Sequence, residues 1–136
     1  MRRGLCIAML LLVGGCLNGA DSKQVDAAFS RLFAQFQAKQ YDVIYDEAAP
    51  ELQTSMPKDT FVAMLQRVDR KLGACPAPTT PTNWRVNATT GGYFAARSYA
   101  LTCANGQMTE SLTVVLRGGQ AKLAGYNASS PLLLTD

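Results

Sequence analysis

The sequence of 136 residues contains no histidine, and none of its four cysteines belongs to a CxxC pair. Common zinc sites draw their ligands from such residues, so the composition predicts neither a metal site nor a bound cofactor. No basic run alternates with aromatic residues, which argues against a nucleic-acid partner. We also find no catalytic signature, so the sequence favours a protein without enzymatic activity over an enzyme.

Long apolar runs are scarce as well. The uninterrupted run from Leu5 to Val13 has nine residues, whereas a helix needs about 20 to cross a bilayer. Arg2 and Arg3 precede this run, and small residues follow it. A basic start, a short apolar stretch and small residues before a cut are the anatomy of a secretory signal. We therefore expect the protein to be exported.

Two cleavage sites are consistent with this signal. Val13-Gly14-Gly15-Cys16 resembles the bacterial lipobox, in which a small residue precedes a cysteine that becomes the lipidated first residue. This resemblance implies a signal peptide over residues 1–15, a lipid on Cys16 that anchors the chain to a membrane, and a tether over residues 16–21. The alternative is cleavage after Ala20, which would give a secreted or periplasmic protein without a lipid.

The residue after the lipobox cysteine bears on location in the cell envelope. It is Leu17 rather than aspartate, and by resemblance to Gram-negative lipoproteins this implies the periplasmic face of the outer membrane. Loss of Arg2 and Arg3 with the signal would lower the formal net charge from +3 to +1, so the basic character belongs partly to the signal. The remaining chain is long enough for one domain with its own core.

The cysteines divide into two groups. Cys6 lies in the signal and Cys16 carries the expected lipid, which leaves Cys75 and Cys103. An even pair in an oxidising compartment predicts a disulfide bond, since a metal site would need more ligands. On the chain-entropy model, a bridge across this separation stabilises the fold by about 3.5 kcal/mol.

Apolar residues at helical spacing predict three helices in the first half of the mature chain, over residues 22–39, 41–48 and 57–72. Pro57 suits the first turn of the third helix, and Gly73 suits its end. From Asn83 the apolar period changes to two, which predicts four strands near residues 82–89, 93–104, 107–117 and 120–129. We therefore expect one domain over residues 22–130 and a C-terminal tail over residues 131–136.

The turns between these strands predict their register. If Asn105-Gly106 is a two-residue turn, Leu101 lies opposite Glu110, and if Gly118-Gly119 is another, Glu110 lies opposite Asn127. One face of the meander then carries a predicted core set: Trp84, Val86, Ala95, Arg97, Tyr99, Leu101, Cys103, Met108, Glu110, Leu112, Val114, Leu116 and Leu123. The opposite face carries mainly Ser, Thr, Asn, Arg and Lys. The helices must cover the first face, which makes the fold class α+β.

Several stretches resemble small exported domains of the nuclear-transport-factor-2-like, or cystatin-like, superfamily. They are Tyr41-Asp42-Val43-Ile44-Tyr45, Pro50-Glu51-Leu52, Leu72-Gly73, Gly92-Tyr93-Phe94, Glu110 and Leu123-Ala124-Gly125-Tyr126-Asn127. The resemblance covers residues 22–129. It implies three N-terminal helices packed on a curved four-stranded antiparallel meander, forming a cone whose mouth can be a pocket. It also implies an outer sheet face that can form a homodimer.

Some members of that superfamily, such as ketosteroid isomerase and polyketide cyclases, are enzymes that use a pocket carboxylate with tyrosine or histidine. This chain has no histidine, and we cannot place a carboxylate and a tyrosine on those enzymes' motif positions. A shared fold does not by itself imply a shared activity. No catalytic residue is therefore assigned.

Glu110 heads the candidate pocket residues, because a carboxylate on an apolar face needs a physical reason. It is either a ligand anchor or general base with a raised pKa, or a structural acceptor held by Asn127 or backbone N–H groups. Arg97 would either pair with an anionic ligand or lie over Trp84 in a cation–π contact. Tyr99 and Trp84 suit either a pocket lining or the core.

Three functions follow from these residues. The first is a non-enzymatic envelope lipoprotein that binds a small ligand or a protein partner through the cone mouth or the sheet face. The second is a pocket enzyme of the isomerase or cyclase type with Glu110 as the base. The third is a structural or assembly accessory that acts as a tethered dimer.

Overall fold

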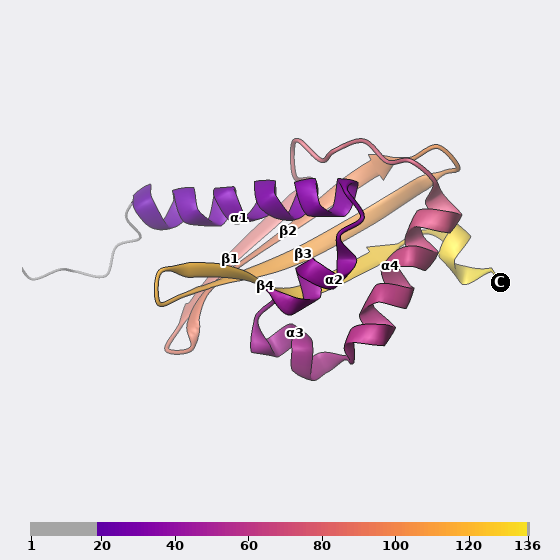
Figure 1. Cartoon of the computed structure of the whole chain (residues 1–136). Coiled ribbons are helices and arrows are strands. Elements are labelled where there is room, and N and C mark those ends of the chain that lie inside the picture. The colour runs from indigo at the N-terminus through magenta and orange to yellow at the C-terminus, as the bar shows by residue number, and fades with distance from the viewer. Residues whose placement is uncertain (1–18, 136) are drawn as a thin grey trace, which may run out of the picture.

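Four α-helices precede a four-stranded sheet within residues 19–135, which the computed structural model describes (Figure 1). The helices are α1 (Gly19–Gln37), α2 (Tyr41–Asp46), α3 (Pro50–Ser55) and α4 (Lys58–Leu72). The strands are β1 (Asn83–Thr89), β2 (Gly92–Thr102), β3 (Gln107–Arg117) and β4 (Gln120–Ser129), and a 3-10 turn, η1 (Pro131–Leu134), follows them. The α+β class is therefore confirmed, with one helix more than predicted.

The predicted signal and Cys16 lie outside the described residues. Helix α1 begins at Gly19, so the last part of the predicted tether is helical. None of the helices in the described part of the chain is long and apolar enough to cross a membrane.

The additional helix, α3, starts at Pro50, and its place follows from the chain just before it. The second predicted helix was expected to reach residue 48, but α2 ends at Asp46. The backbone N–H of Ala49 then donates a hydrogen bond to the carbonyl of Leu123 on β4, at 2.9 Å. Proline is favoured in the first helical turn because it has no N–H to satisfy there, and Pro50 occupies that position in α3.

The sheet is an antiparallel meander in the order β1-β2-β3-β4, as predicted. Gly118 and Gly119 both have positive φ (58° and 75°) and form the predicted two-residue turn between β3 and β4. Glycine adopts this conformation without a steric penalty. Val114 consequently lies opposite Leu123, as expected.

The turn between β2 and β3 differs from the prediction. Thr102 pairs with Gln107, so four residues connect the strands, and Tyr99 rather than Leu101 lies opposite Glu110. The reason is that this loop caps α4: the backbone N–H of Asn105 donates to the carbonyl of Leu72 at 2.9 Å, and its side-chain amide donates to Lys71. Because the register moves by two residues, each side chain keeps its predicted face.

A register shift between Thr113 and Val114 changes the pairing of β4. Thr113 pairs with Gly125 and Val114 with Leu123, so Ala124 is an extra residue. An inserted residue turns the following side chains to the other face. Glu110 consequently lies opposite Ala128, and the prediction that it faces Asn127 is wrong.

The core lies between the helices and the inner face of the sheet. In Figure 1 the helices lie in front of the strands. Their apolar side chains meet those of β2, β3 and β4; this cluster includes Phe29, Leu32, Ile44, Phe61, Leu112, Val114 and Leu123. A second cluster surrounds the disulfide bond and includes Val68, Leu72, Tyr99, Leu101 and Met108. Leu132 and Leu133 of η1 pack against this second cluster.

The predicted disulfide between Cys75 and Cys103 is present, with their Cα atoms 4.2 Å apart. It ties the segment that follows α4 to the end of β2. The expectation that Trp84 and Val86 join the core is wrong, since their exposed fractions are 67% and 45%. Their strand carries no buried residue, so the helix layer does not cover it.

Candidate ligand pocket

A cavity of about 370 Å³ lies between the end of α1, the start of α2, α4, the segment after α4, and strands β2, β3 and β4. Its inner wall is mostly apolar and aromatic, and its rim includes exposed polar residues. The lining residues are Phe33, Phe36, Gln37, Lys39, Tyr41, Leu65, Val68, Asp69, Gly73, Ala74, Cys75, Pro76, Pro78, Leu101, Met108, Glu110 and Tyr126. This volume lies within the range of small-molecule sites.

Glu110 lies at the inner end of this cavity. Its position in β3 between inward-facing Met108 and Leu112 aims its side chain at the helices, and only 7% of the residue is exposed. Among residues 19–135, none forms a hydrogen bond or ion pair with its carboxyl group. Burial without a compensating partner raises the pKa of this carboxyl from 4.5 to about 7.

Two tyrosines stand near this carboxyl. Tyr126 comes from β4 and Tyr41 from the first residue of α2. Burial raises the pKa of Tyr126, and the charges of Glu110 and Tyr41 raise it further. Burial also raises the pKa of Tyr41, with added contributions from Asp69 and Glu110. Both phenols therefore keep their protons at neutral pH.

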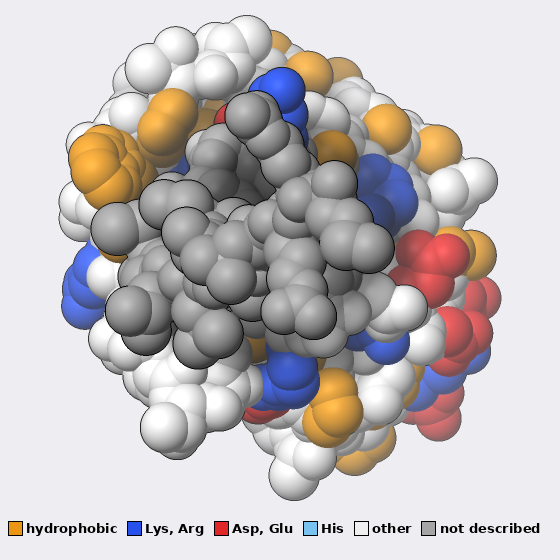
Figure 2. Space-filling view, turned by 90° about the vertical axis from the view of Figure 1, so that its left-hand side faces the viewer, with side chains coloured by type: hydrophobic (Ala, Val, Ile, Leu, Met, Phe, Trp, Pro, Cys, Tyr) orange, Lys and Arg blue, Asp and Glu red, His pale blue; other side chains and the backbone are white. Residues whose placement is uncertain are grey.

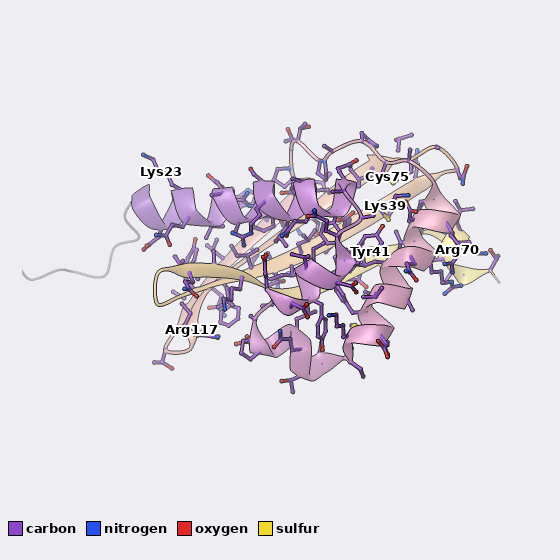
Figure 3. All side chains as sticks on the ribbon, in the orientation of Figure 1. Lys23, Lys39, Tyr41, Arg70, Cys75 and Arg117 are labelled. Carbon is purple, nitrogen blue, oxygen red and sulfur yellow. A yellow bond between two sulfur atoms is a disulfide. The ribbon has the colours of Figure 1, made fainter. Side chains whose placement is uncertain are left out.

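An ion pair stands at the rim of the cavity. The Nζ atom of Lys39 lies 2.9 Å from a carboxylate oxygen of Asp69, which joins the loop after α1 to α4. Gln37 donates a hydrogen bond to the carbonyl of Cys75 at 3.1 Å, on another part of the rim. In Figure 3 the labelled Lys39, Tyr41 and Cys75 lie near one another, around the end of α1. The disulfide-bonded segment is thus part of the cavity wall.

Arg97 and Tyr99 lie outside this cavity. The guanidinium of Arg97 stands 4.3 Å from the ring centroid of Phe29 and forms an ion pair with Asp26. Its cation–π partner is thus Phe29 instead of the predicted Trp84, because α1 covers this part of β2. Tyr99 is buried, with its ring edge-on to Phe33 at 5.1 Å. Burial raises the pKa of Tyr99.

Trp84 and Asn127 are also separate from Glu110. Trp84 lies directly opposite Arg97 in the sheet, and both line a second groove of about 350 Å³ beside the start of α1. Asn127 is exposed and pairs with Ser111, on the outer face. Of the five predicted pocket residues, the cavity thus contains Glu110 alone. Sequence reasoning missed Tyr126, which the extra residue at Ala124 turns inward.

Surface charge gives little further indication of a site. On the face that Figure 2 shows, acidic side chains gather at the right-hand side, and lysines and arginines are scattered. Several exposed charges are paired, including Lys58 with Asp46 and Arg117 with Glu51. Over residues 19–135, no group of three or more His, Cys, Asp or Glu side chains is placed to hold a metal ion.

Comparison with known proteins returned neither a matching family model nor a matching curated protein. The chemistry of the cavity is therefore the basis for function. A carboxyl group with a pKa near 7 can bind a cation, donate or accept a hydrogen bond, or take a proton from a ligand.

Proposed function

We propose that this protein binds a small ligand in the Glu110 cavity, as an exported lipoprotein held at the membrane through Cys16. The observation that carries the proposal is the buried Glu110 carboxyl, which has no hydrogen-bond partner among the described residues and lines an open cavity. Buried polar groups are nearly always paired with protein or water, so a carboxyl that lines a cavity without a protein partner is available to a partner from outside the chain. A ligand group would supply that partner.

The architecture supports the same proposal. Helices packed on one face of a four-stranded antiparallel meander are compatible with the nuclear-transport-factor-2-like fold. Proteins of that fold can hold ligands between helices and sheet. In this chain the walls formed by Leu65, Val68 and Met108 would bury the apolar part of a ligand, while Glu110 would orient its polar group.

A fragment screen with the full chain, as the producing cells process it, tests this proposal. Ligand-observed NMR would compare the wild-type protein with Ala74→Trp, which places a large ring at the exposed rim of the cavity. Ala63→Trp is the matched control, because Ala63 is an exposed residue of α4 that does not line the cavity. We expect fragments that bind the wild type and the control but not Ala74→Trp. Equal binding to all three, or no binding, would contradict the proposal.

A second function is a proton-transfer enzyme of the isomerase type. The observation that favours it is the presence of three groups in one cavity: the carboxyl of Glu110, with a pKa of about 7, and the neutral phenols of Tyr41 and Tyr126. Glu110 would take a proton from carbon beside a carbonyl, and a phenol would donate a hydrogen bond to the enolate oxygen. The test is isomerisation of a β,γ-unsaturated ketone. Activity that rises through pH 7 and disappears in Glu110→Gln would support this function, and an unchanged rate would exclude it.

A further inference from the structure

The charges that line the cavity do not balance. Lys39 and Asp69 neutralise each other at the rim, where their charged atoms lie 2.9 Å apart. Glu110 is buried and has no countercharge within residues 19–135, since burial is the only cause of its raised pKa. Whenever its carboxyl is ionised, the cavity carries one net negative charge in a region poorly screened by water.

Aromatic side chains surround the same space. Phe33 and Phe36 line it from α1, Tyr41 from α2 and Tyr126 from β4. The rings of Phe36 and Tyr126 lie 5.3 Å apart between centroids, so they form a continuous part of the wall. Aromatic groups attract organic cations through the negative faces of their rings, and a cluster of them with a carboxylate is suited to an ammonium group.

We propose that the ligand of this cavity is a small organic cation whose ammonium or quaternary ammonium group lies against Glu110 and the tyrosine rings. The inference rests on the proposed ligand-binding function and names the chemical class of the ligand. The apolar part of the cation would lie along Leu65, Val68 and Met108. A divalent metal ion fits less well, because calcium needs six to eight oxygen ligands and the buried part of this cavity supplies one carboxylate.

The affinity of the cavity for a cation should depend on pH. The ionisable groups that face Glu110 are Tyr41 from α2, Asp69 from α4, Tyr99 from β2 and Tyr126 from β4, with Lys39 at the rim. The pKa values of the three tyrosines are all raised, so these phenols stay neutral near pH 7. Titration in this range therefore belongs to Glu110, with its pKa of about 7. A cation binds the ionised form, so its affinity should increase about tenfold from pH 6 to pH 8.

Choline and 3,3-dimethylbutan-1-ol test the inference, because they have the same shape and differ in the positive charge. Calorimetric titration of the full chain at pH 8 should give a dissociation constant at least about tenfold lower for choline. Glu110→Gln should remove this difference. Glu51→Gln, which changes an exposed carboxylate outside the cavity, should preserve it.

The pH dependence in the wild-type protein is a second readout that requires no variant. Equal affinities for the two probes, absence of choline binding at both pH values, or a choline affinity that does not change between pH 6 and pH 8 would overturn the inference. If fragments still bind in the screen and Ala74→Trp still blocks them, the ligand-binding function stands and only the cation is wrong. If the screen also finds no binding, both proposals fail.

Discussion

The carboxyl of Glu110 on β3 and the phenol of Tyr126 on β4 line the same cavity, and the charge of Glu110 helps to raise the pKa of Tyr126. Neither group has a hydrogen-bond partner within residues 19–135. Such an arrangement is costly for folding, because a buried carboxylate loses its hydration without gaining a partner. Glu110 differs from the paired carboxylates on the surface because its carboxyl lines a cavity and has no partner within residues 19–135.

Glu110 should make the protein less stable as pH rises. Its folded-state pKa of about 7 lies above the value of 4.5 for a free side chain, so the folded state binds its proton more tightly than the unfolded state. The resulting stabilisation is complete below pH 4.5 and is lost as pH rises to 7. Between pH 5 and pH 8 we expect Glu110 to lower the free energy of unfolding by about 2.5 kcal/mol.

Urea denaturation at both pH values measures this effect. The glutamine in Glu110→Gln cannot ionise. From pH 5 to pH 8 the free energy of unfolding of this variant should therefore fall by about 2.5 kcal/mol less than that of the wild type. Glu51→Gln is the control, because Glu51 is exposed and its pKa is lowered by Arg117. If the wild type and Glu110→Gln show the same dependence on pH, the carboxyl does not titrate near 7.

The disulfide should contribute to stability and to the shape of the cavity. Cys75 lines the cavity, and its bridge to Cys103 closes a loop with a sequence separation of 28. Replacing both cysteines by serine should lower the free energy of unfolding by about 3.5 kcal/mol in urea denaturation. A reducing agent should produce a similar loss in the wild-type protein and none in the double variant. A double variant as stable as the oxidised protein would contradict this role.

Trp84 offers a test of how far the core extends. It is largely exposed, so Trp84→Ala should change the free energy of unfolding by less than about 1 kcal/mol. Leu112→Ala, at a fully buried position on β3, should lower it by about 2–5 kcal/mol. Chemical denaturation of both variants checks the contrast. A large loss for Trp84→Ala would mean that this strand face is covered.

Much of the fold could be predicted because it depends on local patterns. Paired glycines at residues 118 and 119 specify a tight turn, and alternation places Leu112 and Val114 in the core. Cys75 and Cys103 were the remaining cysteine pair, and they are bonded. The extra helix was missed because proline suits both the end of one helix and the start of the next, and Pro50 starts α3.

The other differences between the predicted and the observed structure arise from tertiary contacts. Asn105-Gly106 has the composition of a two-residue turn, yet Asn105 caps α4, a helix distant in the sequence. Gly125, a glycine inside a strand, is the sequence signal for the extra residue at Ala124, which exchanges Asn127 for Tyr126 on the inner face. Glu110 could be predicted as a site residue because a charge on an apolar face is unusual. The tyrosines around it could not, because their positions depend on the bulge and on the packing of α2.

Export and lipidation decide whether the ligand-binding domain is anchored to a membrane, and one substitution tests both predictions. If Cys16 is the lipidated first residue, the full chain expressed in a bacterium should partition into the membrane fraction, with an intact mass that includes acyl chains. Cys16→Ser should lose both the lipid mass and the membrane partition, because the serine hydroxyl cannot replace the thiol in lipid transfer. The wild-type protein treated identically is the reference. A soluble wild-type product whose mass corresponds to a chain starting at Asp21 would instead establish cleavage after Ala20, and the cavity would then belong to a freely diffusing protein.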